Sequence, residues 1–362
     1  MGYTQDIGKS NGAAAVKGKM VMTCLFLILL MSFFLTGCTG SNVSTQEPDK
    51  QEDPDKMVIG MSFDSFLIER WQRDRDVFVD TCKELGARVN VQNANGDVET
   101  QISQIRYLIS KKVNAIVIVG IDADALSDVC SEARDAGIPI IAYDRMIHNG
   151  GASLYISFDN RQVGQLMGEG LAKELSDSDK VLMLAGPTED PNVGELGDGF
   201  ESVMKEKGIE IVDKMHCDGW KPELAAEYIN ENIDLLDEVD GIMCGNDNIA
   251  TAVYRVLAER RRAGRIKLVG QDADLEACQR IVQGTQVMTV YKPVEKEAKA
   301  AAEYACKLAA GESLPDLDTK LDGTYLVPYV LLDPIAVDKN NIDETVIDAG
   351  FHLKEDVYLY AD

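Results

Sequence analysis

Residues 112–145 read KVNAIVIVGIDADALSDVCSEARDAGIPIIAYDR, and this stretch decides the fold class. The run AIVIV at 115–119 is short, apolar and rich in β-branched residues, which predicts a buried strand. Residues 124–136 alternate apolar and charged side chains as an amphipathic helix does, and Gly137 follows where a left-handed helix cap favours glycine. A second apolar run at 139–143 completes a strand, crossover helix and strand, which is the unit of a parallel sheet.

The same alternation continues along the chain from residue 57. The predicted strands are 57–62, 88–92, 115–119, 139–143, 180–184, 209–214, 241–244, 267–270 and 287–290. The predicted helices are 69–85, 98–111, 124–136, 160–175, 199–207, 222–232, 248–262 and 292–310. The pattern runs once before Asp159 and again after Lys180, so we predict an α/β protein of two similar, doubly wound, Rossmann-like lobes.

The N-terminal region has the features of an export signal. A basic flank that ends at Lys19 precedes an uncharged apolar run at 20–35, MVMTCLFLILLMSFFL, and Cys38 follows closely. This run is shorter than the roughly 20 apolar residues of a membrane-spanning helix, although a single N-terminal membrane anchor stays open as an alternative. Residues 39–56 are polar and charged, so we expect them to form a flexible tether.

Composition excludes several classes of partner and cofactor. The chain has 61 acidic and 36 basic residues, a formal net charge of −25, which argues against binding to nucleic acid or anionic lipid. The sequence lacks a GxxxxGK[ST] phosphate loop and a metal-ligand cysteine spacing, so we expect no cofactor and no metal. Six cysteines lie beyond residue 38, and their apolar surroundings favour buried free thiols, with disulfides as the alternative: Cys82, Cys130, Cys217, Cys244, Cys278 and Cys306.

Polar and aromatic residues gather directly after the predicted strands, where open α/β sheets bind their ligands. These segments are 63–64, 120–122, 144–145, 186–188, 245–247, 271–274 and 291–293. Carboxylates and amides accept protons from sugar hydroxyls, arginine and lysine donate to sugar oxygens, and the faces of Trp71 and Trp220 suit a sugar ring. The structural alternatives are core packing for the tryptophans, a loop salt bridge for Asp144 and Arg145, and a turn cap for Asn246.

Several of these segments together resemble the D-xylose-binding branch of the periplasmic sugar-binding proteins. The matching motifs are ERWQ at 69–72, DRD at 74–76, YDRM at 143–146, YISFDN at 155–160, GQDAD at 270–274 and MTVYKP at 288–293. ETQISQI at 99–105, DGW at 218–220 and NIDETVI at 341–347 also match, so the likeness runs from residue 57 to the end. The ending LTGC at 35–38 resembles the lipobox, in which the cysteine is acylated and becomes the first residue.

The resemblance implies the type I periplasmic-binding-protein fold, with a sugar held between two hinged lobes. It divides the chain into a lipoprotein signal peptide at 1–37, the lipidated Cys38 with its tether at 38–56, an N-terminal lobe at 57–160 plus 292–325, and a C-terminal lobe at 161–291 plus 326–362. Hinge crossings are expected near Asn160, Lys292 and Tyr325. The implied sugar contacts are Arg70, Trp71, Asp144, Arg145, Trp220, Asn246, Asp272 and Lys292.

One segment departs from the family pattern. The family places a sugar-binding arginine after the first strand of the second lobe, where residues 189–200 read EDPNVGELGDGF and contain none. Losing a charged donor to a sugar hydroxyl costs about 1.5–3 kcal/mol. The departure therefore implies weaker binding of D-xylose, or another pentose or polyol as ligand.

The resemblance implies an exported protein, lipid-anchored on the outer face of the cell membrane, that delivers a monosaccharide to the permease of an ABC importer. The alternative partner is a membrane histidine kinase or chemoreceptor that reports the sugar. An enzyme that uses Asp272 and Asp274 as an acid–base pair is a third possibility, against which the resemblance argues. The export signal and the lack of a basic helix-turn-helix exclude a cytoplasmic repressor of the same fold.

Overall fold

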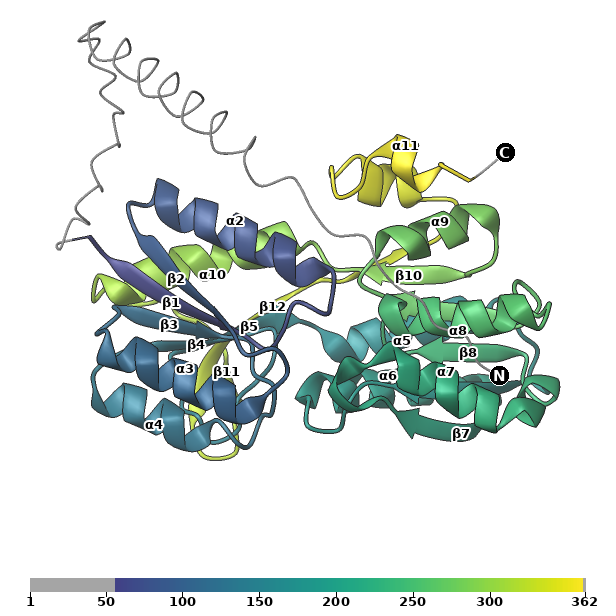
Figure 1. The fold of residues 1–362 in the computed structure, drawn as a ribbon, viewed down its shortest axis with the longest axis horizontal. Coiled ribbons are helices and arrows are strands. Elements are labelled where there is room, and N and C mark those ends of the chain that lie inside the picture. The colour runs from purple at the N-terminus through teal and green to yellow at the C-terminus, as the bar shows by residue number, and fades with distance from the viewer. Residues whose placement is uncertain (1–55, 361–362) are drawn as a thin grey trace, which may run out of the picture. The chain divides into compact units, whose positions relative to one another are not determined.

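Two β-sheets flanked by helices form the part of the chain that the computed structural model describes, residues 56–360 (Figure 1). The expected signal peptide at 1–37, the acylated Cys38 and the tether up to residue 55 lie outside the described residues. None of the helices between residues 56 and 360 is both long and apolar enough to cross a bilayer.

The first sheet has the strand order β11-β12-β5-β4-β3-β1-β2, in which only β11 and β12 run antiparallel. Its strands are β1 (Val58–Phe63), β2 (Arg88–Asn93), β3 (Ala115–Ile118), β4 (Ile140–Tyr143), β5 (Leu154–Phe158), β11 (Thr319–Leu321) and β12 (Leu326–Leu332). Its helices pack in two pairs, α2 (Arg70–Glu84) with α10 (Val294–Ala309), and α3 (Val98–Ser110) with α4 (Ser127–Asp135). In Figure 1 these pairs cover opposite faces of the sheet, as doubly wound crossovers require.

The second sheet has the order β13-β10-β9-β8-β6-β7, in which only β13 and β10 are antiparallel. Its strands are β6 (Lys180–Ala185), β7 (Glu210–His216), β8 (Gly241–Cys244), β9 (Lys267–Gln271), β10 (Met288–Tyr291) and β13 (Ile335–Val337). The helices around it are α5 (Asn160–Ala172), α6 (Pro191–Lys207), α7 (Pro222–Glu231), α8 (Asp247–Glu259), α9 (Leu275–Gln283) and α11 (Lys354–Val357), with three short turns of helix at Asp218–Trp220, Ile233–Asp237 and Asp343–Ile347. The predicted α/β fold with two doubly wound lobes is confirmed.

Two glycines let α5 and α6 pack backbone against backbone. A Cβ atom on Gly164 would lie 1.9 Å from the carbonyl oxygen of Leu196, and one on Gly199 would lie 2.1 Å from that of Arg161. Both distances are far inside van der Waals contact, so any larger residue would force the two helices apart. This contact fixes the start of α6, which carries part of the candidate site.

The chain passes between the two sheets at three places. Two of them lie between β5 and α5, near Asn160, and between β10 and α10, near Lys292. The third differs from the boundary predicted at 325/326, because β12 pairs in parallel with β5 and residues 326–332 therefore belong to the first sheet. The passage lies instead between β12 and β13, at residues 333–334.

Candidate ligand-binding site

A cavity of about 20 Å³, room for roughly one water molecule, lies at the carboxyl ends of strands from both sheets. Its lining residues are Ile68, Arg70, Trp71, Asp144, Arg145, Asp190, Asn192, Trp220, Asn246, Gln271, Asp272 and Lys292. All of them are buried. The structure thus brings all eight residues that the sequence singles out around one small polar cavity.

Arg70, at the first position of α2, binds three buried carboxylates. Its guanidinium donates to Asp74 (3.0 Å), Asp144 (2.9 Å) and Glu297 (2.7 Å). One cation cannot balance three anions, and burial raises the pKa of Asp74 and raises that of Glu297 strongly, although Arg70 opposes both shifts. The network fixes the position and orientation of the guanidinium before any ligand arrives.

Asp144 stays ionised because it is surrounded by cations. Burial raises its pKa, but the charges of Arg70 and Lys292 outweigh burial and hold the pKa below its ordinary value. The side-chain amide of Asn192 donates to the Asp144 carboxylate at 2.9 Å and to its backbone oxygen at 3.1 Å. An ionised carboxylate in this position is a strong acceptor for hydroxyl groups.

Arg145 joins the two halves of the site. Its Nη1 donates to Asp64 and to the carbonyl oxygen of Gly120, both at 2.9 Å, and its Nε lies 2.6 Å from Asp190 on the other lobe. Burial raises the pKa of Asp190, and Arg145 opposes this rise. The same carboxylate accepts a hydrogen bond from the indole nitrogen of Trp220 at 3.1 Å. Asp190 is therefore the point where an arginine of one lobe and a tryptophan of the other meet.

Both tryptophans are buried against the site. The Arg70 guanidinium lies 4.4 Å from the centre of the Trp71 ring, a cation–π distance. The ring of Trp220 lies so close to Gly186 that a Cβ there would be 2.4 Å from it. The core-packing alternative thus describes part of their environment, while both rings also line the cavity.

Three of the eight residues have strained backbones. The φ angles of Asp144, Trp220 and Asp272 are 63°, 59° and 94°, in the left-handed region that non-glycine residues rarely adopt. Such strain persists only where surrounding contacts enforce it, and it is common at ligand sites. Asn246 combines two roles, since its side-chain oxygen caps α8 through the Ile249 N–H at 2.9 Å while the residue also lines the cavity.

Several polar atoms that line the cavity have no hydrogen-bond partner among the described residues. They are the donors Trp71 Nε1 and Asn246 Nδ2 and the acceptors Gln271 Oε1 and Asp272 Oδ1, the last of which lies 3.4 Å from the Lys292 ammonium. Buried polar atoms are normally satisfied, so donors and acceptors left over around one cavity point to a ligand that supplies both. A polyhydroxyl compound is such a ligand.

Four lining residues were not among the predicted contacts: Ile68, Asp190, Asn192 and Gln271. Asp190 and Asn192 lie in the segment that lacks the family arginine, and α6 begins there at Pro191, not at residue 199 as predicted. The signal was present in the sequence, because Asp followed by Pro is a typical N-cap and first helical residue. The Asp190 carboxylate accepts from the Asn192 N–H at 3.0 Å and so places both side chains at the cavity.

Comparison with known proteins agrees with this geometry. The family model described as periplasmic binding protein domain matches residues 59–313. The chain is 40% identical to the D-xylose-binding periplasmic protein of Haemophilus influenzae, over 83% of this chain and 92% of the relative, and 39% identical to that of Escherichia coli, over 91% and 99%. A solved ABC-transporter solute-binding protein from Clostridium phytofermentans with bound β-D-glucose is 28% identical and superimposes with a TM-score of 0.76, over 83% of this chain and 99% of that structure.

Proposed function

Since the chain belongs to the periplasmic binding protein family, we propose that it captures D-xylose between its two lobes and hands it to an ABC sugar importer. It is a binding protein and not an enzyme. The relatives that are about 40% identical are described as D-xylose-binding, and this gives the choice of sugar.

The observation that carries the proposal is the set of unpaired polar atoms in the cavity. A sugar hydroxyl both donates and accepts, so one ring can satisfy Trp71 Nε1 and Asn246 Nδ2 as well as Gln271 Oε1 and Asp272 Oδ1. Leaving each of these buried atoms unsatisfied costs about 1–3 kcal/mol, and ligand binding removes that cost. The cations and carboxylates around them supply the charge-assisted bonds that distinguish one stereoisomer from another.

The missing arginine changes how the sugar is held. Asp190 and Asn192 occupy that part of the wall, and both already bind side chains of the other lobe, Arg145 and Asp144. These two residues stabilise the contact between the lobes instead of donating a charged hydrogen bond to the sugar. We therefore expect D-xylose to remain the preferred ligand, with an affinity lowered by about one to two powers of ten relative to a site that has the arginine.

Delivery follows from closure of the lobes. Residues of both lobes line the cavity, so the sugar favours the state in which they meet, and a permease can recognise that state by its outer surface. We further propose that acylation of Cys38 keeps the exported protein at the membrane near its transporter. Two acyl chains give the stable attachment that a single chain does not.

Titration calorimetry with D-xylose, D-ribose, L-arabinose, D-glucose and D-galactose tests the proposal, with Trp220→Ala as the site variant. We expect D-xylose to bind most tightly and the variant to lose most of this affinity. No heat with D-xylose, or unchanged binding in the variant, would contradict the proposed ligand or the proposed site.

A further inference from the structure

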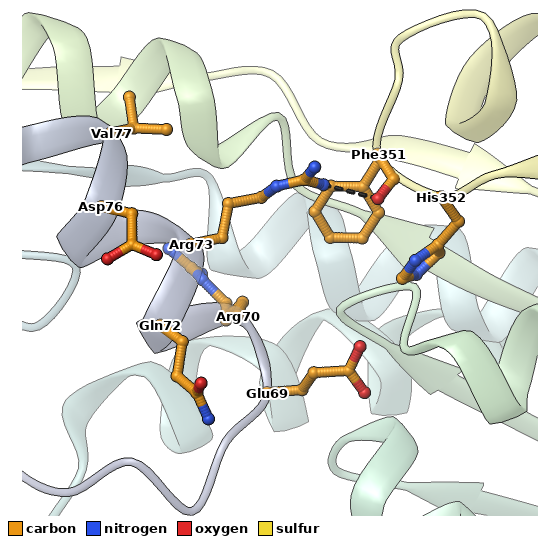
Figure 2. Close-up of a pocket in the computed structure, with 8 residues that line it drawn as sticks. All are labelled: Glu69, Arg70, Gln72, Arg73, Asp76, Val77, Phe351 and His352. Atoms are coloured by element: carbon orange, nitrogen blue, oxygen red, sulfur yellow. Dashed lines mark hydrogen bonds between the residues drawn. The ribbon is translucent and has the colours of Figure 1, made fainter. Parts of the chain in front are cut away.

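The segment Gly350, Phe351 and His352, which precedes α11, lies behind the sugar cavity. Figure 2 shows Phe351 and His352 on one side of a hollow and Glu69, Arg70 and Arg73 of the α2 region on the other. Arg70 lines both this hollow and the sugar cavity. The segment therefore lies next to the site without lining it.

His352 holds the loop that carries Asp272. Its Nε2 lies 2.8 Å from the backbone oxygen of Ala273, and a carbonyl oxygen only accepts, so Nε2 carries the proton and donates. Burial lowers the pKa of His352, which keeps the ring neutral at pH 7. The neutral ring has a single N–H, and this contact uses it.

The loop needs such support because its backbone is strained. The φ angles of Asp272 and Ala273 are 94° and 56°, so two successive non-glycine residues are in the left-handed region. The Asp272 N–H donates to the Val290 oxygen at 2.8 Å, and the Ala273 N–H donates to the Thr289 hydroxyl at 3.1 Å. Both acceptors belong to β10, whereas His352 binds the carbonyl oxygen of Ala273, on the C-terminal side of the two strained residues.

Phe351 extends the contact to two further parts of the site. Its ring centre lies 4.9 Å from that of Tyr291, the residue before Lys292. The Arg73 guanidinium lies 4.5 Å from the Phe351 ring and donates to the backbone oxygens of Phe351 at 2.6 Å and Gly350 at 3.0 Å, and Figure 2 shows this approach. Arg73 lies one turn of α2 after Arg70.

Three contacts of the segment thus fall close to sugar-site residues: Ala273 is next to Asp272, Tyr291 is next to Lys292, and Arg73 lies one turn from Arg70 on α2. We propose that residues 350–352 position the sugar site from behind, and that His352 is the positioning residue for Asp272. The inference rests on the proposed function for its effect on affinity, but the positioning itself can be measured without sugar.

Two variants separate the hydrogen bond from the ring. His352→Phe keeps an aromatic ring against Phe351 and removes the donor, whereas His352→Gln keeps a donor at about the reach of Nε2. The control is His148→Phe, because His148 is partly exposed and contacts Asp124 on the surface. For each protein we would measure D-xylose affinity and dissociation rate, the melting temperature, and backbone amide exchange in residues 272–274 without sugar.

We expect His352→Phe to weaken D-xylose binding about 10- to 50-fold, mainly through faster dissociation, with a melting temperature within a few degrees of wild type. His352→Gln should bind within about threefold of wild type, and amide exchange at 272–274 should quicken only in the Phe variant. Unchanged exchange and affinity in His352→Phe, or equal losses in the Phe and Gln variants, would overturn the proposal. If the wild-type protein binds no tested sugar, the proposed function fails, while the exchange rates still decide whether His352 holds the loop.

Discussion

The ion pair between Arg145 and Asp190 gives a prediction that separates closure from folding. The two side chains are 4% and 2% exposed, come from different lobes and lie 2.6 Å apart. Asp190→Asn removes the charge but keeps the shape, and asparagine caps helices as well as aspartate does, so α6 should form normally. Arg145 keeps its second buried partner, Asp64 at 2.9 Å, so the variant loses one charge-assisted contact, worth about 1.5–3 kcal/mol, and does not leave an uncompensated charge.

This cost applies only when the lobes are together, since water solvates both groups when they separate. Sugar affinity should therefore fall by about 10- to 100-fold, at 1.4 kcal/mol for each factor of ten, while the melting temperature without sugar changes little. Calorimetry and thermal unfolding measure the two effects. The matched control is Glu132→Gln, which breaks an exposed pair with Arg106 and should leave affinity unchanged. Wild-type affinity in Asp190→Asn would refute the argument that this pair stabilises the closed state.

Three further predictions follow from other contacts. Gly186→Ala places a methyl group against the Trp220 ring and should cost about 1–3 kcal/mol of sugar binding, with a shift in tryptophan fluorescence; binding equal to wild type would show that the ring moves freely. Burial raises the pKa of Asp247 to about 7, so the contribution of this carboxyl to stability is greatest below about pH 4 and is lost as the pH rises through 7. The melting temperature of Asp247→Asn should lack this part of the pH dependence. Parallel curves of melting temperature against pH for the variant and the wild type would contradict it. Interaction with Cys82 on α2 lowers the pKa of the Cys306 thiol on α10, so the Cys306 thiolate should attack oxidised glutathione and the mixed disulfide should then exchange with Cys82. Mass spectrometry should find a loss of two hydrogens that Cys306→Ser abolishes, and oxidation without that link would contradict the pairing.

Most central strands could be predicted because each is a short apolar run that its neighbours bury on both faces. The exception is β5, which is fully buried between β12 and β4 but was not among the predicted strands, because it follows β4 without the intervening helix that the alternation predicts. β12 was missed for a physical reason: Pro328 interrupts it, its side chains are mostly half-exposed, and its partner β5 lies far away in the sequence. β13 has only three residues, too few for a pattern to show. The lobe boundary near residue 325 was displaced by the same omission.

The position of a candidate site residue could be predicted where it follows a strand closely. Asp144, Asn246 and Asp272 come after β4, β8 and β9, so the parallel topology alone brings them to one edge of each sheet. Asp190 and Asn192 lie farther from β6 and depend on the start of α6, which was predicted at residue 199 and lies at Pro191. Contacts between the lobes, such as Arg145 with Asp190, have no signal in a single sequence because they join segments that no local pattern connects.

The most direct test of the account is a crystal structure of the protein grown with D-xylose. The account predicts one sugar ring in the cavity between the lobes, with its hydroxyls hydrogen-bonded to Trp71 Nε1, Asn246 Nδ2, Gln271 Oε1 and Asp272 Oδ1. A sugar bound elsewhere, or a closed cavity filled only by water at saturating D-xylose, would contradict it.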